Sequence, residues 1–421
     1  MEGTLTHKIL SRKAGRAVSP GEIIVVDVDL AYAHDGTAPL AIKVMEESRT
    51  LMKVADPEKV ALVIDHASPP PTVAAATVHR QMREFARRFG VKLFDVGEGI
   101  CHQVIPESGL VKPGMVVLGA DSHTVTLGAF TAFATGVGST DIAVAFATGK
   151  TWLKVPDTVK VELQGTLEEP LMGKDVILKL IGEVTASGLT YKAVEFVGEG
   201  VRTISVASRM TISNMTVEAG AKAGIFPTDG KLISWYEERF GYSPKPIQPE
   251  DNASYEEELN LNLSNLEPQV AAPPNVDNVH PVSEVEGVEV DQVFIGSCTN
   301  GRFEDFLMAA KILKRGRVRQ GVRCVAIPAS RRVYIDLIRS GIAEMLANAG
   351  CVLAHSTCGP CIGAHLGLLA EGEVAVSTTN RNFTGRMGHK DSKVYLVSPA
   401  TAAASAITGR LTDPREFIGG G

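Results

Sequence analysis

Apolar runs alternate with helix-spaced segments over most of the chain. The runs at 60–64 and 115–119 are continuously hydrophobic, which is typical of buried strands. Between them, 71–89 carries apolar residues at helical spacing and is followed by Gly90, which favours an amphipathic helix ending at that glycine. Because strands and helices alternate along the chain in this way, the pattern predicts an α/β fold.

The periodicity is interrupted once, from residue 242 to about 285. Prolines, acidic residues and turn formers are frequent there, and no apolar face is visible. A new α/β unit begins with the hydrophobic run 292–295. We therefore expect an N-terminal α/β region at 1–285, built from two subdomains and ending in a connector, and a C-terminal α/β domain at 286–421.

Composition and charge exclude several classes of protein. The 421 residues are 44% hydrophobic and 21% charged, as in ordinary globular proteins, and are too many for one core. The net charge of −6 gives no basic footprint, so nucleic acid is not an expected partner. The N-terminus lacks a signal-peptide pattern, and no apolar stretch is long enough to span a membrane. The sequence therefore predicts a cytoplasmic protein without membrane contact.

Three of the six cysteines stand in loop-forming sequence. Cys358 and Cys361 flank a Gly-Pro turn, and Cys298 follows an apolar run about sixty residues earlier. The turn alone also fits a redox dithiol or half of a zinc knuckle, whereas three thiolates together suit zinc or an iron–sulfur cluster. No fourth cysteine stands in similar context, and a metal with an open position is typical of a catalytic site. The remaining cysteines are predicted as two core thiols and one loop residue: Cys324, Cys351 and Cys101.

Histidines next to acidic residues form a second group of candidates. Three successive predicted strands are followed by Asp65-His66, His102 and Asp121-x-His123. In open α/β sheets the loops after the strands converge on a ligand-binding crevice. An imidazole held by a carboxylate can deliver a proton to a poor leaving group, so these residues indicate acid–base chemistry.

The order of three motifs resembles that of the aconitase superfamily. Gly-Ser-Cys-Thr-Asn-Gly stands around Cys298, Cys-Gly-Pro-Cys-Ile-Gly begins at Cys358, and Asn-Arg-Asn-Phe-Thr-Gly-Arg spans 380–386. The chain is most similar to the large, catalytic subunits of the prokaryotic two-subunit branch, from about residue 5 to 415. This resemblance implies a three-part α/β/α assembly around one [4Fe-4S] cluster per subunit, without the C-terminal swivel domain of full-length aconitases.

The resemblance also implies a role for each candidate residue. The cluster ligands would be Cys298, Cys358 and Cys361. The acid–base group would comprise Asp65 with His66, His102 with Asp121, and His123 with Glu195. Substrate carboxylates and hydroxyls would meet Arg381, Arg386, Asn380, Asn300 and His34.

The expected reaction is the isomerisation of 2-isopropylmalate and 3-isopropylmalate in leucine biosynthesis, by loss and return of water. Pro39 stands where aconitases proper have Gln, which argues against citrate as the substrate. The alternatives are a homoaconitase large subunit, a dimethylmalate dehydratase and, more remotely, an RNA-binding iron sensor. Because the swivel domain carries the family's carbon base, a separate small subunit is expected in a heterodimer or heterotetramer.

Overall fold

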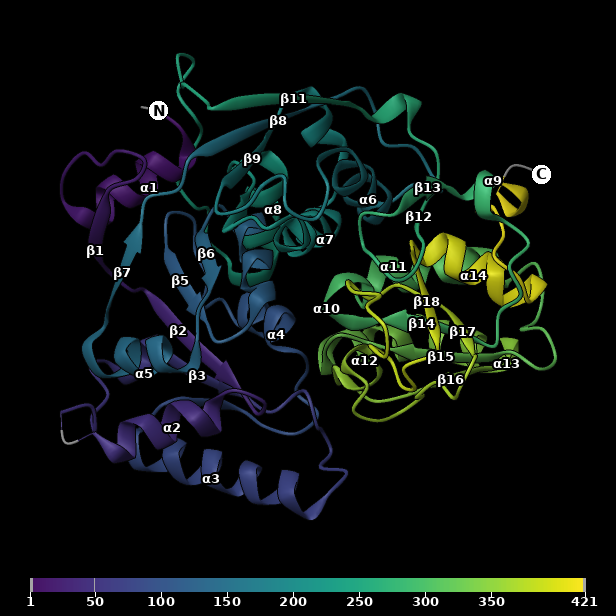
Figure 1. The fold of residues 1–421 in the computed structure, drawn as a ribbon, viewed down its shortest axis with the longest axis horizontal. Helices are drawn as coiled ribbons and strands as arrows, with labels where there is room; N and C mark the ends of the chain where they lie inside the picture. The colour runs from purple at the N-terminus through teal and green to yellow at the C-terminus, as the bar shows by residue number, and fades with distance from the viewer. Residues whose placement is uncertain (1–2, 49, 419–421) are drawn as a thin grey trace.

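The computed structural model describes residues 3–48 and 50–418, which form three α/β units (Figure 1). The first unit contains a parallel sheet in the order β4-β3-β2-β5-β6. Its strands are β2 (Leu30–His34), β3 (Val60–Val63), β4 (Lys92–Phe94), β5 (Val116–Gly119) and β6 (Phe133–Gly136). Its helices are α1 (Leu5–Ala14), α2 (Ala38–Glu47), α3 (Val73–Phe89), α4 (Cys101–Glu107) and α5 (Ser139–Thr148). The antiparallel pair β1 (Ile23–Asp27) and β7 (Lys150–Lys154) stands beside this sheet.

Local sequence explains the limits of the predicted helix α3. Thr72 caps its first turn by accepting a hydrogen bond from Ala75 N, and Gly90 ends it in the left-handed conformation at φ 69°. Met82, Phe85 and Ala86 are buried on the sheet side, as the helical spacing predicts. The predicted strands at 60–64 and 115–119 are confirmed as β3 and β5, each buried along its whole length.

The second unit has a smaller parallel sheet in the order β10-β9-β8-β11. Its strands are β8 (Thr158–Gln164), β9 (Ala193–Val197), β10 (Ala223–Ile225) and β11 (Glu257–Asn262), and its helices are α6 (Gly173–Val184), α7 (Val206–Met215) and α8 (Gly230–Phe240). The α/β class is therefore confirmed in this part of the chain as well.

The third unit is a seven-stranded sheet in the order β13-β12-β18-β17-β14-β15-β16. Its strands are β12 (Gln269–Ala271), β13 (Val279–Pro281), β14 (Gln292–Gly296), β15 (Arg323–Ile327), β16 (Cys351–Leu353), β17 (Val374–Ser377) and β18 (Lys393–Val397). Its helices are α9 (Val282–Val285), α10 (Ser297–Asn300), α11 (Phe303–Leu313), α12 (Arg331–Arg339), α13 (Ile342–Ala349) and α14 (Pro399–Thr408).

The segment expected to be a connector is instead part of two sheets. β11 pairs with β8, and β12 pairs with both β13 and β18 in the C-terminal sheet. Residues 269–281 therefore belong to the third unit, although we expected that unit to begin at 286. β12 and β13 have only three residues each, which is too short for a hydrophobic alternation to be visible in the sequence.

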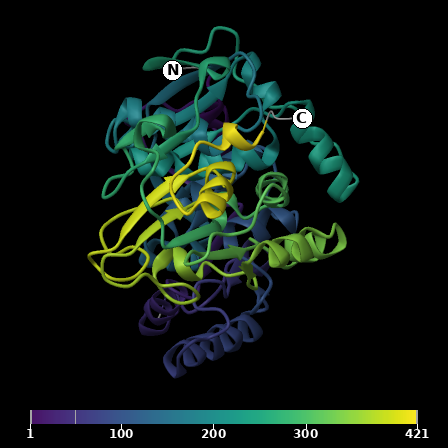
Figure 2. The ribbon, with the colours of Figure 1, turned by 90° about the vertical axis from the view of Figure 1, so that its right-hand side faces the viewer.

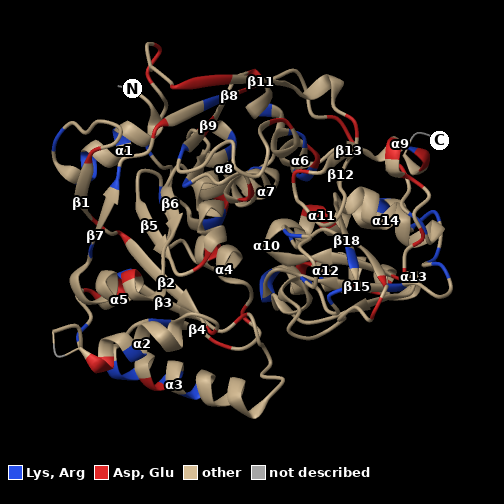
Figure 3. Cartoon of the chain, in the orientation of Figure 1, with Lys and Arg blue, Asp and Glu red and all other residues tan. Residues whose placement is uncertain are grey.

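The three units meet at one place, between α4, α7 and α10 in Figure 1. Figure 2, turned by 90°, shows the C-terminal unit in front of the N-terminal one. Lys, Arg, Asp and Glu are interspersed over all three units, as Figure 3 shows. Among the described residues, no helix is both long and apolar enough to cross a bilayer.

Candidate active site

Cys298 is presented by a sharp turn at the end of β14. Ser297 has φ 78°, a left-handed conformation that costs a non-glycine residue free energy, and α10 starts at this residue. Cys358 precedes the 3₁₀ turn Gly359–Ile362 and Cys361 lies within it; Gly359 has φ 38°, and Cys361 N donates to Cys358 O at 3.0 Å. All three thiols are buried yet line one cavity. The predicted meeting of the two cysteine loops is therefore present in the structure.

Amide donors surround the sulfur of Cys298. Asn214 Nδ2 lies 3.2 Å from Cys298 Sγ, and Asn380 Nδ2 lies 3.5 Å from it. Ser297 Oγ lies 3.8 Å from the sulfurs of both Cys298 and Cys361. Burial raises the pKa of the Cys298 thiol to about 12, so this sulfur needs a strong counter-charge, such as a metal, to exist as a thiolate.

The cavity has a volume of about 160 Å³ and is lined mostly by polar side chains. Besides the three cysteines, its lining comprises His66, His102, Asp121, Ser122, His123, Asn380, Arg381 and Arg386 with Ile100 and Ile362. Three soft sulfur ligands on one wall, with N–H donors directed at sulfur, match the chemistry of an iron–sulfur site. One atom each of His102, His123 and Cys298 also lie within 4.8 Å of one another, so a single ion could be held in the same cavity.

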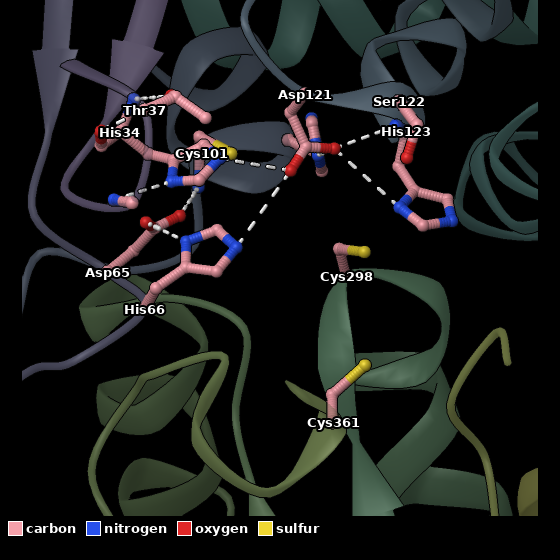
Figure 4. Close-up of polar contacts among 12 residues, drawn as sticks. His34, Thr37, Asp65, His66, Cys101, Asp121, Ser122, His123, Cys298 and Cys361 are labelled. Atoms are coloured by element: carbon pink, nitrogen blue, oxygen red, sulfur yellow. Dashed lines mark hydrogen bonds and ion pairs between the residues drawn. The ribbon is translucent and has the colours of Figure 1, made fainter. Parts of the chain in front are cut away.

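Asp121 is the centre of the acid–base group, as Figure 4 shows. It follows β5, and its Oδ1 accepts from His102 Nε2 at 2.9 Å and from the His123 backbone N–H at 2.7 Å. Its Oδ2 lies 3.2 Å from His34 Nε2. Burial alone would raise the pKa of Asp121, but the surrounding imidazoles hold it well below its usual value. The carboxylate is therefore ionised and can orient several imidazoles.

His66 is held by a neighbouring carboxylate. Its Nδ1 lies 2.6 Å from Asp65 Oδ1, and its Nε2 lies 3.8 Å from Asp121 Oδ2. Burial lowers the pKa of His66, but Asp65, Asp121 and Asp35 outweigh that effect and raise it to about 9. The imidazole ring is thus a cation at neutral pH, with its Nε2 proton on the cavity side.

Asp35 fixes the backbone of the Asp65-His66 segment, a role that no sequence motif indicated. Its carboxylate accepts from the backbone N–H groups of Asp65, His66 and Ala67 at 2.8–3.2 Å. His34, expected to contact substrate, lies behind the cavity lining. Its ring stacks on His66 at 3.7 Å between centroids, and its Nδ1 accepts from Gly36 N. The His34 proton therefore sits on Nε2, directed at Asp121.

The predicted pair of His123 with Glu195 is wrong. His123 Nε2 instead bonds Glu218 Oε1 at 2.7 Å. Glu195, in β9, is fully buried and accepts from Leu5 N at 2.9 Å and Thr6 N at 2.8 Å. These are unpaired N–H groups at the start of α1, so Glu195 caps that helix, away from the cavity.

Glu218 also connects the acid–base group to the substrate-binding candidates. Arg381 Nε lies 2.9 Å and 3.0 Å from the two Glu218 oxygens, and Arg381 Nη2 donates to Ser122 Oγ at 2.9 Å. Burial raises the pKa of Glu218, but His123 and Arg381 outweigh it and keep the pKa below its usual value. Glu218, like Asp35, is a site residue that the sequence did not reveal.

The remaining substrate-binding candidates divide into two groups. Arg386 and Asn380 line the cavity, and Arg386 Nε has no hydrogen-bond partner among residues 3–48 and 50–418. Asn300 is directed into the protein instead, where its Nδ2 donates to Asp305 Oδ1 at 2.9 Å. Asn300 therefore supports the Cys298 loop from behind and does not line the cavity, contrary to expectation.

The fold and this cavity define the class of protein. A profile of the aconitase family (aconitate hydratase) matches residues 7–409, so the chain belongs to the aconitase family. The expectation drawn from the three motifs is thereby confirmed.

Several named proteins are similar to this chain along nearly its whole length. A protein from Methanopyrus kandleri named 3-isopropylmalate dehydratase large subunit 1 is 52% identical, over 99% of this chain and 100% of its own. The 3-isopropylmalate dehydratase large subunit of Aquifex aeolicus is 49% identical, over 99% and 98%. A probable methanogen homoaconitase large subunit from Methanothermobacter thermautotrophicus is 48% identical, over 99% of both chains.

A solved structure shows the same fold. The holo-form of Thermococcus kodakaraensis aconitase X superposes with a TM-score of 0.51 over 90% of each chain, at 13% sequence identity. The aconitase-like α/β architecture expected from the sequence is thus confirmed.

Proposed function

We propose that this chain is the catalytic large subunit of a [4Fe-4S] hydro-lyase that interconverts 2-isopropylmalate and 3-isopropylmalate in leucine biosynthesis, in the cytoplasm. One observation carries the proposal. Three cysteine thiols line a cavity together with three carboxylate-bound imidazoles and two arginines. Relatives at 49–52% identity that are named as this subunit support the choice of substrate.

Cys298, Cys358 and Cys361 would hold the cluster. When bound, the cluster would supply Lewis-acid chemistry for the substrate hydroxyl. The chain's own residues supply the proton. His66 carries one at Nε2 at neutral pH, and the leaving hydroxyl needs a proton to depart as water.

The remaining side chains position the substrate and the imidazoles. Arg386 offers a guanidinium in the cavity whose Nε is not yet bonded within the described chain, and a guanidinium fits a carboxylate in bidentate fashion. Arg381 is held by Glu218 and Ser122, so its remaining N–H groups have a fixed direction. Asp121 keeps His102 oriented toward the cavity. These side chains are therefore already oriented before the substrate binds, so the reaction does not have to order them.

The base that removes the proton from carbon would come from a separate small subunit. In this family that base lies on the swivel domain, and the relatives named above are large subunits. We infer that one small subunit closes over each cavity in a heterodimer or a heterotetramer. We infer a small hydroxy dicarboxylate as the substrate, because two guanidinium groups line this cavity and can each bind a carboxylate.

The test is to reconstitute the chain anaerobically with a small subunit from its own genome and to measure formation of the unsaturated intermediate. We expect turnover of isopropylmalate with a kcat/KM at least tenfold above that of homocitrate or dimethylmalate. A higher kcat/KM for homocitrate would assign the chain to the homoaconitase group, in which relatives of 48–50% identity are also found. No turnover by the iron-loaded complex with any of these acids would refute the proposal.

A further inference from the structure

Lys174 is a fully buried lysine that none of the motifs includes. It is the second residue of α6, in the second unit, and its exposed fraction is 0%. Gly173 lets this helix end approach the next one closely, because a Cβ there would lie 2.5 Å from Ser208 O. The first turn of α6 therefore packs closely against α7, and from there the Lys174 side chain reaches into the interface with the C-terminal unit.

The ammonium group binds the chain just before the substrate-binding motif. Lys174 Nζ donates to Thr378 O at 2.9 Å and to Thr379 O at 2.5 Å. Thr378 and Thr379 follow β17 and immediately precede Asn380 and Arg381. A buried ammonium without such acceptors would be strongly unfavourable, so these two carbonyls and the lysine hold one another in place.

The segment that Lys174 holds contacts the sulfur ligands on both sides. Thr378 exchanges hydrogen bonds with Gly296 at 2.9 and 3.0 Å, next to the Cys298 turn. Asn380 Nδ2 lies 3.5 Å from Cys298 Sγ, and Asn380 Oδ1 lies 3.6 Å from Cys361 Sγ. A shift of this segment would therefore move a donor at sulfur and Arg381 together.

We propose that Lys174 is a positioning residue, which fixes the 378–381 segment so that Asn380 meets the cluster sulfurs and Arg381 meets the substrate. Lysine suits this place because its Nζ carries enough hydrogens to donate to both carbonyl oxygens at once. Burial lowers the pKa of Lys174 to about 7, and Cys361, Asp305 and Cys298 act in the opposite direction. The expected effects of Lys174 on substrate binding rest on the proposed function. The expected effect on the backbone of 378–381 is independent of it.

The test compares two variants on one helix. Lys174→Met keeps the length of the side chain but removes the charge and both hydrogen bonds. Lys179→Met is the control, because Lys179 lies on the same helix, is only partly buried and pairs with Glu183 at 3.2 Å. Lys174→Gln retains a donor without the charge and covers the case in which Lys174→Met fails to fold.

The first readout is amide hydrogen exchange of peptides covering 378–386, in the chain as purified and after anaerobic reconstitution. We expect exchange at least tenfold faster in Lys174→Met, an intermediate rate in Lys174→Gln and no change in Lys179→Met. Exchange of 378–386 that equals the control in both Lys174 variants would overturn the proposal, even if the wild-type protein showed no hydro-lyase activity.

The second readout concerns the cluster and the substrate. Because a displacement of about 1 Å costs up to ~100-fold in rate, we expect a 10- to 100-fold loss of kcat/KM, mostly through KM. The electron paramagnetic resonance spectrum of the cluster should shift, and the cluster should be lost faster in air than in the control. A uniform loss of kcat with KM and spectrum unchanged would reduce Lys174 to a purely structural residue.

Discussion

The variant Glu218→Gln tests whether the carboxylate partner of His123 is Glu218, as observed, or Glu195, as expected from the sequence. The carboxylate of Glu218 receives His123 Nε2 at 2.7 Å and Arg381 Nε at 2.9 Å, in a buried position. Glutamine retains one acceptor oxygen, but its amide nitrogen is a donor and would face either the His123 or the Arg381 donor. The substitution also removes the negative charge beside the Arg381 guanidinium. Hydrogen bonds to charged groups contribute about 1.5–3 kcal/mol each, so the loss of one corresponds to about 10- to 150-fold in kcat/KM.

Glu195→Gln is the matched comparison. Glu195 is equally buried but binds Leu5 N, Thr6 N, Thr6 Oγ1 and Tyr255 Oη, all outside the cavity. Loss of acceptors for unpaired backbone donors costs about 1–3 kcal/mol of folding free energy. We expect a lower midpoint of thermal unfolding, and kcat/KM per folded chain within twofold of wild type.

The assay is steady-state turnover by the reconstituted complex, with iron content measured on the same samples. Both variants should load iron like the wild-type chain, because neither glutamate contacts a cysteine ligand in the described structure. If Glu195→Gln lost activity while Glu218→Gln retained it, the reasoning from these hydrogen bonds would be wrong and the expected His123–Glu195 pair would have to form in the working enzyme.

The other predictions concern the ligands, the acid and the partner. Cys298→Ser should abolish iron binding, as iron analysis after reconstitution would show. Cys324→Ser should keep it, because Cys324 is a buried residue of β15 whose sulfur lies 2.8 Å from that of Cys351 in β16. His66→Gln should lower kcat by about 10²- to 10⁴-fold and leave the cluster spectrum unchanged. The control His280→Gln, at a partly exposed position, should change neither kcat nor the spectrum. If kcat of His66→Gln stayed within threefold of wild type, His66 would be excluded as the acid. The iron-loaded chain alone should be inactive, and titration with the small subunit should restore turnover, with saturation near equal amounts; full activity without a partner would mean that the carbon base lies in this chain.

Local features of the site could be predicted from the sequence. The Asp65-His66 pair and the carboxylate of Asp121 stand directly after buried strands, where parallel sheets bring their loops together. The contact between His102 and Asp121 is confirmed, because both residues follow strands of the same sheet. Cys324 and Cys351 are core thiols as expected, whereas Cys101 starts α4 and is fully buried.

Features that depend on how units pack could not be predicted. Glu218 lies in a 3₁₀ turn after α7, within no motif, and only the packing of the second unit against the first brings it to His123. Glu195 is a carboxylate in a strand, as the expected partner of His123 should be. Its side chain instead accepts from the N-terminal N–H groups of α1, about 190 residues away in the sequence. Strand β6 pairs with β5 over four residues, yet its Gly/Ala/Thr-rich sequence shows no strand pattern.

The most direct measurement of the central claim is the count of iron and inorganic sulfide per chain after anaerobic reconstitution, with Mössbauer spectra of the same sample. We expect iron and sulfide in equal amounts, about four of each, and one iron site that becomes distinct when isopropylmalate is added. The cavity could also hold a single ion at His102, His123 and Cys298. One tightly bound zinc per chain, with neither iron nor sulfide, would contradict the claim that these three cysteines carry an iron–sulfur cluster.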